Sequence, residues 1–581
     1  MSPLEILRPY LIRYKRRYAI GFAALLVTQL LGVSLPLWIR SGVDSLLEGF
    51  DTDRLFFFVA LLLGLALTKV IFQFWMRWIL IGISREIEYD LRNDLFRHLM
   101  KLSLRFYNRS RTGELMSKAT NDLNAVRMMV GPGIMYSANT LVVGLGATVL
   151  MLHLDWRLAL LVLAPLPVVF LVVKVFGKKI HDRYEEIQAL NATLSEKVRE
   201  SAVGIRVLRA YGQEAPQLRE FRDVNLEMVG ANRRLIKLWS GLYPGLTFLF
   251  GLSYGAVLWV GGLHVWEGEI SLGTFTAFHI YLMYLIWPMI ALGWVTNLFQ
   301  RGKASLKRIQ TIFDAQPDID DRRAGGLDSP SASLRGEIEF RHLTFAYNGS
   351  DVLKNISLKI PPGRTVALVG ATGSGKSTLV HLLPRLYDPP FGTVFIDGVP
   401  VQEYPLAYLR SQIGFVPQES FLFGQTVRNN IAFGVARATQ GEVERAAEIS
   451  QILPDLERFP RGMETLVGER GITLSGGQKQ RVSISRAVLR DPPILILDDA
   501  LSSVDTFTEE KILRHLKEVM KDRTTLLISH RVSTIRHADE IVVMDQGRIV
   551  ERGTHAELMA QGGVYAELYH KQMIEEELES A

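Results

Sequence analysis

The sequence predicts an all-α domain that crosses a membrane six times, followed by an α/β domain. Hydrophobic residues make up 48% of the 581 residues and the mean hydropathy is +0.15, values typical of a membrane protein. The long apolar runs all lie before residue 300. Later, short apolar segments alternate with helical patterns around glycine-rich loops, which indicates an α/β domain. We expect a transmembrane domain at 1–305, a linker at 306–335 and a soluble domain at 336–581.

Six apolar runs are long enough to cross the hydrocarbon core of a bilayer, which needs about 20 helical residues. These runs are Ala19–Ile39, Leu55–Ile83, Val130–Leu154, Trp156–Phe176, Gly241–Trp266 and Leu272–Phe299. The segment before the first run is basic and the loop after it is acidic. Because basic residues favour the cytoplasmic side, the N-terminus is predicted to be cytoplasmic.

Two long basic connections, at 84–129 and 177–240, are also predicted to be cytoplasmic. Their apolar residues keep a helical period, so we expect the membrane helices to continue well beyond the bilayer. Each connection is interrupted near its middle, at 107–114 and at 204–212. From the residues alone, these tips are inert, solvated ends of two helical hairpins.

Some polar and aromatic residues of the predicted spans are candidates for a substrate cavity. Lys69, Gln73 and Arg77 are four residues apart and share one helical face. Lys69 is near the middle of its run, where a charge either lines a cavity or is paired. The aromatic residues of the sixth run offer a surface for amphipathic compounds or ordinary interhelical packing; they are Phe275, Phe278, Tyr281, Tyr284, Trp287 and Trp294.

The composition excludes several other functions. There is no cysteine, so disulfides, thiolate metal sites and cysteine nucleophiles are absent. The formal net charge is only +6, and basic residues do not form a stripe with interleaved aromatics, so we expect no nucleic-acid partner.

A phosphate-binding loop is predicted between the strand Thr365–Val369 and an apolar helix, the context that such a loop requires. The glycines let backbone N–H groups turn toward a β-phosphate; Lys376 would neutralise phosphate charge and Ser377 would ligate Mg²⁺. The loop comprises Gly370, Ala371, Thr372, Gly373, Ser374, Gly375, Lys376, Ser377 and Thr378.

A second glycine-rich turn precedes another strand that ends in acids. The turn contains Ser475, Gly476, Gly477 and Gln478 and leads into a helix, whose N-terminus attracts an anion. The apolar run 494–497 indicates a buried strand, and Asp498 and Asp499 follow it. A carboxylate at such a strand end is where a phosphate-bound Mg²⁺ is held.

Across the whole chain, these motifs resemble those of the ATP-binding cassette (ABC) exporters: an all-α six-helix transmembrane domain with long cytoplasmic extensions, fused to an α/β P-loop nucleotide-binding domain. The resemblance implies ATP and Mg²⁺ as cofactors. It also implies that the two loop tips are coupling helices that dock on the nucleotide domains, with Phe106 and Tyr211 as apolar anchors. It further implies that Tyr347 stacks on adenine, that Gln418 contacts Mg²⁺ and the attacking water, and that His530 contacts the γ-phosphate. Asp498 corresponds to the Mg²⁺ ligand, residues 502–505 to the D-loop, and residues 465–471, with Glu469, to the exporter X-loop.

One position departs from the family pattern. The catalytic residue after the Mg²⁺-binding aspartate is usually Glu, and here it is Asp499, which is one methylene, roughly 1.5 Å, shorter. A misplacement of about 1 Å can cost about 100-fold in rate, so the site of Lys376 and Asp498 is expected to bind ATP and hydrolyse it slowly. Because the turn at 475–478 is intact, we expect a heterodimer in which a second half-transporter supplies the catalytic Glu.

The expected function is ATP-driven export of amphipathic or hydrophobic compounds, as in the degenerate-site subunit of bacterial heterodimeric multidrug exporters. Hydrolysis would take place mainly at the site completed by this chain's signature turn. A lipid flippase, a peptide exporter and a regulatory, non-transporting membrane ATPase or channel remain alternatives. We expect a multi-pass protein of the bacterial inner membrane, with the nucleotide domain in the cytoplasm.

Overall fold

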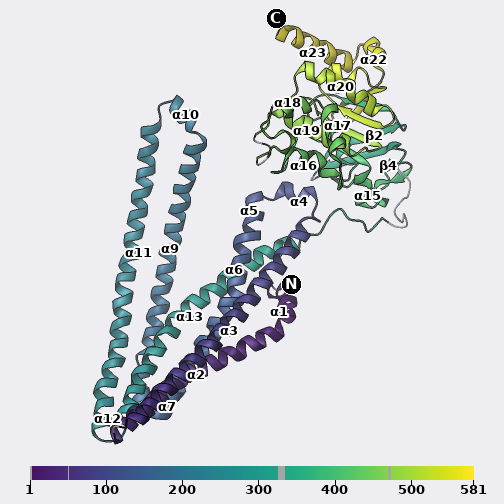
Figure 1. Ribbon diagram of the computed structural model, residues 1–581. Coiled ribbons are helices and arrows are strands. Elements are labelled where there is room, and N and C mark those ends of the chain that lie inside the picture. Colours follow the sequence, from purple (N-terminus) through teal and green to yellow (C-terminus); the bar gives the residue numbers. More distant parts are fainter. Residues whose placement is uncertain are drawn as a thin grey trace. The chain divides into compact units, whose positions relative to one another are not determined.

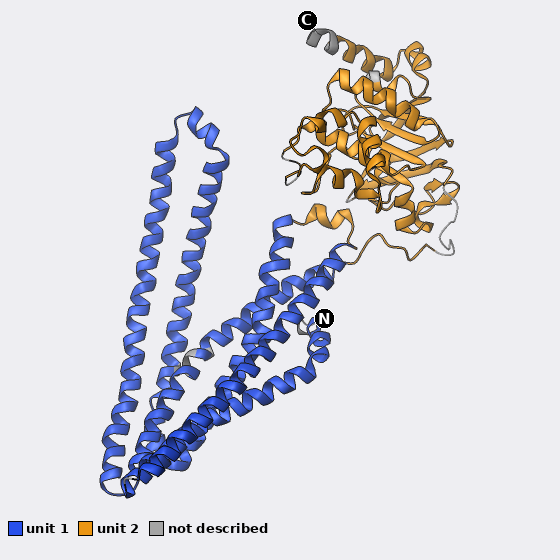
Figure 2. Cartoon of the chain, in the orientation of Figure 1, with its two compact units in different colours: residues 1–100, 111–315 blue, residues 101–110, 316–581 orange. Residues whose placement is uncertain are grey.

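The computed structural model describes residues 3–49, 51–324, 334–347, 349–468, 471 and 473–580. The chain forms two compact units (Figure 2). Unit 1 comprises residues 1–100 and 111–315, and unit 2 comprises residues 101–110 and 316–581. The first of the two predicted tips therefore belongs to the same compact unit as the α/β domain, although it is far from that domain in the sequence.

Unit 1 is all-α and contains, among the described residues, six helical segments long and apolar enough to cross a membrane. They are Lys15–Glu48, Thr52–Leu99, Thr112–Leu154, Trp156–Val203, Glu214–Trp266 and Leu272–Phe313. Each contains one predicted apolar run, so the six-span prediction is confirmed. The helices also extend far beyond these runs, as the helical period of the connections predicted.

Within these segments the helices are α1 (Arg8–Arg13), α2 (Lys15–Glu48), α3 (Thr52–Leu99), α5 (Thr112–Ser117), α6 (Leu123–Met128), α7 (Ile134–Leu154), α8 (Trp156–Leu163), α9 (Leu166–Val203), α10 (Ile205–Ala210), α11 (Glu214–Ala256), α12 (Gly262–Trp266) and α13 (Leu272–Phe313). Short π-helical turns join α5 to α6, α6 to α7 and α11 to α12. Helices α9 and α11 lie side by side as a long hairpin that ends in α10 (Figure 1).

Small residues let the helices of unit 1 approach closely. A Cβ on Gly131 would come within 2.5 Å of Ser84 on α3, and one on Gly302 within 2.5 Å of Met129. Both contacts lie at the ends of the predicted apolar runs, where glycine lets the helix backbones come close together. Of the aromatic residues on α13, Phe278 and Tyr281 are fully buried, and the Tyr281 hydroxyl donates to Val33 O at 2.8 Å. These two rings therefore serve interhelical packing, whereas Trp287 and Trp294 are exposed.

Unit 2 contains two sheets. A four-stranded sheet has the order β2-β1-β4-β5, and a six-stranded sheet has the order β10-β9-β3-β8-β7-β6. In the larger sheet β9, β3, β8, β7 and β6 are parallel and β10 is antiparallel. The strands are β1 (Ile338–Tyr347), β2 (Ser350–Ile360), β3 (Thr365–Val369), β4 (Val394–Ile396), β5 (Val399–Pro400), β6 (Ile413–Val416), β7 (Ile494–Asp498), β8 (Thr524–Ile528), β9 (Glu540–Asp545) and β10 (Arg548–Gly553).

The helices of unit 2 are α4 (Leu104–Arg109), α14 (Lys376–His381), α15 (Leu406–Ser411), α16 (Val427–Ile431), α17 (Gln440–Ile449), α18 (Leu453–Glu457), α19 (Gly476–Leu489), α20 (Thr506–Met520), α21 (Val532–Ile535), α22 (His555–Gln561) and α23 (Val564–Ser580). One apolar core includes residues of both sheets and of α14, and a second covers the other face of the large sheet with α19 and α20. The α/β class is as predicted. Helix α13 continues into the first residues of the predicted linker, and residues 325–333 of that linker lie outside the described residues.

Candidate nucleotide site at the carboxyl ends of the parallel strands

The large sheet brings the predicted site residues to one edge. Lys376 and Ser377 follow β3, Asp498 ends β7, His530 follows β8 and Gln418 follows β6. In the register, Asp498 pairs with Ile528 of β8. Since parallel strands end at the same edge of a sheet, these side chains come from neighbouring positions at the edge where α/β folds bind ligands.

Two glycines of the phosphate loop are required by its backbone path. Gly370 has φ +147° and Gly375 has φ +100°, a region that favours glycine. A Cβ on Gly370 would overlap Met544 O, and one on Gly375 would come within 2.8 Å of Leu353 Cδ2. The loop therefore packs tightly against β9 and β2, with no room for larger residues at these positions.

The Lys376 ammonium lies at the centre of this loop. It donates to Gly370 O at 2.8 Å, Ala371 O at 2.9 Å and Ser374 Oγ at 3.3 Å. Burial lowers the pKa of Lys376, while the carboxylates of Asp498 and Asp499 act in the opposite direction. The arrangement holds a cation where phosphate charge would need neutralising.

The residues predicted to bind Mg²⁺ are in contact. Ser377 Oγ donates to Asp498 Oδ1 at 3.0 Å. Burial raises the pKa of Asp498, against opposing effects of Ser377, Lys376 and His530. No cluster of three or more His, Asp or Glu residues that could hold a metal occurs in the described part of the chain. One hydroxyl and one carboxylate fit Mg²⁺, which binds through few protein oxygens together with substrate phosphates.

Asp499 occupies a left-handed turn directly after the strand, with φ +49°. Its backbone N–H donates to Ile528 O at 2.9 Å, and its carbonyl accepts from Ser502 Oγ at 3.1 Å and from Gln480 Nε2 at 3.4 Å. The backbone is thus held from both sides, and it cannot easily move forward to compensate for a short side chain.

Gln418 and His530 are both exposed. Gln418 lies two residues beyond β6, and His530 lies two residues beyond β8. His530 is close enough to Asp498 to lower the pKa of that carboxyl. The structure therefore brings His530 to the Ser377–Asp498 pair, and it places Gln418 at the same edge of the sheet.

The signature turn begins α19 as a capping box. Ser475 Oγ accepts from Gln478 N at 3.3 Å, and Gln478 Oε1 accepts from Ser475 N at 3.0 Å. A Cβ on Gly477 would come within 2.7 Å of Ser503 O, whereas one on Gly476 would make an ordinary contact of 3.4 Å with Ser503 Cβ. Gly477 therefore lets the predicted D-loop pack directly on the signature turn.

Sequence reasoning missed Gln480 as part of this assembly. It lies on α19 and is buried. Its Nε2 donates to Ser502 Oγ at 2.8 Å, and its Oε1 accepts from Ser503 N at 2.8 Å. Gln480 joins the signature helix to the turn that carries Asp499. Because α19 carries several other polar residues, including the buried Ser483 and Ser485, the sequence did not distinguish Gln480 from them.

Tyr347 ends β1 and is half-buried. Its ring contacts Tyr387 at a centroid distance of 4.9 Å, and the side chain of Thr378 in the phosphate loop is near enough to act on the pKa of its hydroxyl. Burial raises the pKa of Tyr347. Tyr347, the residue predicted to stack on adenine, therefore lies close to the phosphate loop, as it must if both bind the same nucleotide.

The two tips predicted to be cytoplasmic differ in their surroundings. The first tip, α4, lies in unit 2, where Asn108 Nδ2 donates to Tyr387 OH at 2.8 Å and Phe106 is partly buried. The second tip, α10, lies in unit 1, and Tyr211 beside it is 76% exposed. Glu469 of the predicted X-loop lies outside the described residues.

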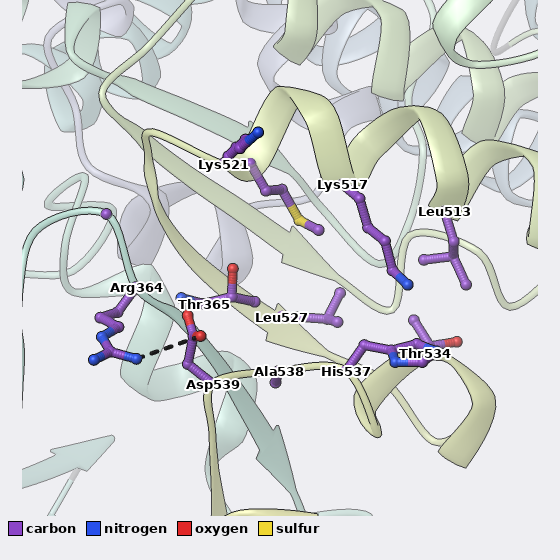
Figure 3. Close-up of a pocket in the computed structure, with 12 residues that line it drawn as sticks. Arg364, Thr365, Leu513, Lys517, Lys521, Leu527, Thr534, His537, Ala538 and Asp539 are labelled. Carbon is purple, nitrogen blue, oxygen red and sulfur yellow. Dashed lines mark hydrogen bonds and ion pairs between the residues drawn. The ribbon is translucent and has the colours of Figure 1, made fainter.

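A pocket of about 540 Å³ lies elsewhere in unit 2 (Figure 3). It is lined by Arg364 and Thr365 at the start of β3, by Asp539 just before β9 and by Lys517 on α20. Arg364 and Asp539 form an ion pair of 3.4 Å there. The pocket is at the amino ends of β3 and β9, so it is separate from the candidate nucleotide site.

Six membrane-spanning helical segments and a phosphate loop at the carboxyl edge of a parallel sheet define a membrane protein with a fused P-loop nucleotide-binding domain. Comparison with known proteins agrees with this class. Residues 18–289 match the family described as "ABC transporter transmembrane region", and residues 353–502 match the family described as "ABC transporter". The chain belongs to the ABC transporter family and is an ABC exporter with its transmembrane and nucleotide-binding domains fused.

Three similar proteins extend over almost the whole chain. It is 39% identical to the "Probable multidrug resistance ABC transporter ATP-binding/permease protein YheI" of Bacillus subtilis, over 99% of this chain and 98% of that protein. It is 35% identical to an "ATP-dependent lipid A-core flippase" of Syntrophus aciditrophicus, over 99% and 94%. A solved bacterial Atm1-family ABC exporter with ATP bound is 28% identical and covers 96% of this chain and 98% of its own, with a TM-score of 0.76.

Proposed function

We propose that this exporter moves amphipathic or hydrophobic compounds outward across a bacterial inner membrane, as one half of a heterodimer. The name of the Bacillus relative supports a multidrug role. The basic connections at 84–129 and 177–240 support a cytoplasmic nucleotide domain. In this proposal, residues 1–305 form the transmembrane domain, 306–335 the linker and 336–581 the nucleotide-binding domain.

The proposed roles of the site residues follow their geometry. Residues 370–378 cradle the phosphates, with Lys376 as the central cation, and Tyr347 stacks on adenine, a contact worth about 1–3 kcal/mol. Ser377, Asp498 and Gln418 would hold Mg²⁺, which neutralises phosphate charge when bound. Asp499 is at the position that orients the attacking water, and His530 contacts the γ-phosphate. Water attacks the γ-phosphorus, the bond to the β-phosphate oxygen breaks, and ADP and phosphate form.

The observation that carries the heterodimer proposal is the contrast between Asp499 and the signature turn. The Asp499 backbone is held by Ile528, Ser502 and Gln480, so its shorter side chain stays about 1.5 Å behind the position of a Glu carboxylate. The capping box of Ser475 and Gln478 is complete. A complete signature turn is useful only opposite a site that hydrolyses ATP, and such a site needs a partner with Glu.

Two exposed apolar surfaces support a dimer. The α10 tip exposes Val203 at 84%, Val207 at 61% and Tyr211 at 76%. In unit 2, Phe421, Phe423 and Phe433 are exposed, with ring centroids 5.1 Å and 4.4 Å apart for successive pairs; we call them the aromatic patch. We propose that the α10 tip of each subunit docks on the nucleotide domain of the other, at this patch in the present chain.

Single-turnover hydrolysis tests this proposal. The chain is purified alone and together with a half-size ABC partner that carries Glu, and release of phosphate from two bound ATP molecules is followed. We expect one fast and one slow turnover per heterodimer, and slow turnover at every site of the chain alone. Equal fast rates at both sites, or fast hydrolysis by the chain alone, would contradict the heterodimer.

A lipid flippase is the second candidate function, because a relative 35% identical to this chain is named as a lipid A-core flippase. Vesicle assays with a fluorescent dye and a labelled lipid, side by side, separate the two. ATP-dependent accumulation of the dye supports multidrug export, whereas movement of the lipid alone supports the flippase.

A further inference from the structure

We propose that Tyr387 is a positioning residue that couples the first cytoplasmic tip to the adenine end of the nucleotide site. This inference rests on the proposed role of Tyr347 as the adenine platform. It goes beyond that role because it names the residue and the contacts through which nucleotide binding and the cytoplasmic tip would influence each other.

Tyr387 lies in the loop after α14 and is half-buried against the apolar core of unit 2. Its hydroxyl accepts a hydrogen bond of 2.8 Å from Asn108 Nδ2 on α4. Its ring meets that of Tyr347 edge to face, at a centroid distance of 4.9 Å and an angle of 77°. One side chain therefore contacts both the tip of the membrane helices and the predicted platform.

The contacts continue to the rest of the site. The side chain of Thr378 in the phosphate loop is near enough to the Tyr347 hydroxyl to act on its pKa. The Tyr387 ring also lies 6.4 Å from that of His381, which contacts the ring of Phe415 at 5.6 Å and lies 3.9 Å from Asp498. Tyr387 thus contacts both this ring cluster and the first tip.

These contacts depend on direction as well as distance, so a change in the position of Asn108 changes the orientation of the Tyr387 and Tyr347 rings. A hydrogen bond fixes where the Tyr387 hydroxyl lies, and an edge-to-face pair fixes the tilt of the Tyr347 ring. When Asn108 holds Tyr387, Tyr347 is held at one orientation for stacking on a base. By linkage, stacking of adenine on Tyr347 then favours the docked position of α4 to the same degree.

The coupling is testable without knowing the transported compound, by measuring nucleotide affinity in a double-mutant cycle. The full chain is reconstituted in nanodiscs in EDTA, and ATP binding is measured for Tyr387→Phe, Asn108→Ala and the double variant. We expect each single variant to weaken ATP binding by about 5-fold, a typical coupling, and the double variant to be no weaker than either. Additive losses, or no loss, would overturn the proposal.

Two controls make the result specific. Ser103 Oγ, just before α4, donates to Asp318 Oδ2 at 3.0 Å, and this bond involves no residue of the ring cluster, so Ser103→Ala should leave ATP affinity unchanged. Inorganic tripolyphosphate has no base to stack, so its affinity should be the same for wild type and Tyr387→Phe. A loss of tripolyphosphate binding, or an equal effect of Ser103→Ala, would assign Tyr387 a purely structural role and refute the coupling.

The proposed nucleotide function can fail separately from this inference. Lys376→Ala should abolish binding of both ATP and tripolyphosphate. If wild type binds neither, or if Lys376→Ala binds both, the nucleotide site is wrong. If wild type binds both and Lys376→Ala neither, while the Tyr387 and Asn108 variants behave as wild type, only the coupling is wrong.

Discussion

Replacing Asp499 with Glu tests the central argument about this exporter. The added methylene extends the carboxylate by roughly 1.5 Å, and a correction of about 1 Å is worth about 100-fold in rate, or about 2.7 kcal/mol of barrier. Because Ile528, Ser502 and Gln480 hold the backbone, the extension should reach the attacking water and not be lost in a backbone shift. We expect the slow turnover of the proposed heterodimer to become about 100 times faster.

The substitution also has a cost that can be separated from the gain. Asp499 has φ +49°, where Asp is several-fold more common than most residues, so Glu should destabilise the fold by about 1 kcal/mol. Asp491 is a matched control, because it is also left-handed, with φ +53°, and it is exposed and pairs with Arg523 outside the site. Asp491→Glu should cause a similar loss of stability and no change in rate.

The assay is single-turnover phosphate release from the heterodimer with both sites loaded, together with thermal unfolding of each variant. The expected result is two phases for wild type and for Asp491→Glu, and a single fast phase for Asp499→Glu. If Asp499→Glu leaves the slow phase unchanged while it binds ATP normally, side-chain length is not what limits this site, and the reasoning from reach is wrong.

Three further predictions concern the nucleotide site and the membrane domain. Burial raises the pKa of Asp498, so the folded protein binds the proton of this carboxyl more tightly than the unfolded protein does, and the free energy of unfolding falls as pH rises above the usual carboxyl range near 4. Asp498→Asn should therefore raise the melting temperature of the nucleotide-free protein at pH 7 and weaken Mg²⁺-dependent ATP binding. A lower melting temperature would contradict this prediction. Gly477→Ala places a Cβ within 2.7 Å of Ser503 O, so it should stop the fast turnover of the heterodimer, whereas Gly476→Ala should retain most of it. Lys69 lies near the middle of its apolar run, with Nζ 3.2 Å from the position that a Cβ on Gly32 would occupy. If Lys69 lines a cavity, Lys69→Gln should reduce vesicle uptake of anionic dyes more than uptake of cationic dyes. An equal reduction for both kinds of dye would indicate a structural role.

Local patterns in the sequence were enough to predict the elements with strong periodicity or steric requirements. Six apolar runs predicted six spans, and the glycine pattern at 370–375 predicted a loop that the backbone confirms through its positive φ angles at Gly370, Gly373 and Gly375. The class of each domain followed from the same patterns, because hydrophobic period and glycine placement are local properties.

Contacts between distant segments could not be predicted in this way. Nothing near Asn108 in the sequence indicates that it bonds Tyr387, and nothing near Gln480 indicates that it holds Ser502 and Ser503. The aromatic residues of α13 were ambiguous for the same reason: only the packed structure shows that Tyr281 donates to Val33 on another helix. Such contacts depend on which surfaces meet, and that is decided by the whole fold.

Helix α3 is continuous over 48 residues, from Thr52 to Leu99, and at 1.5 Å per residue it is a rod of about 72 Å. If the helix stays straight, a tilt of about 5° about one end displaces the other end by about 6 Å. Leu99, the last residue of α3, is followed within a few residues by α4. A small change in the tilt of α3 would therefore move the start of that connection by more than the length of a side chain.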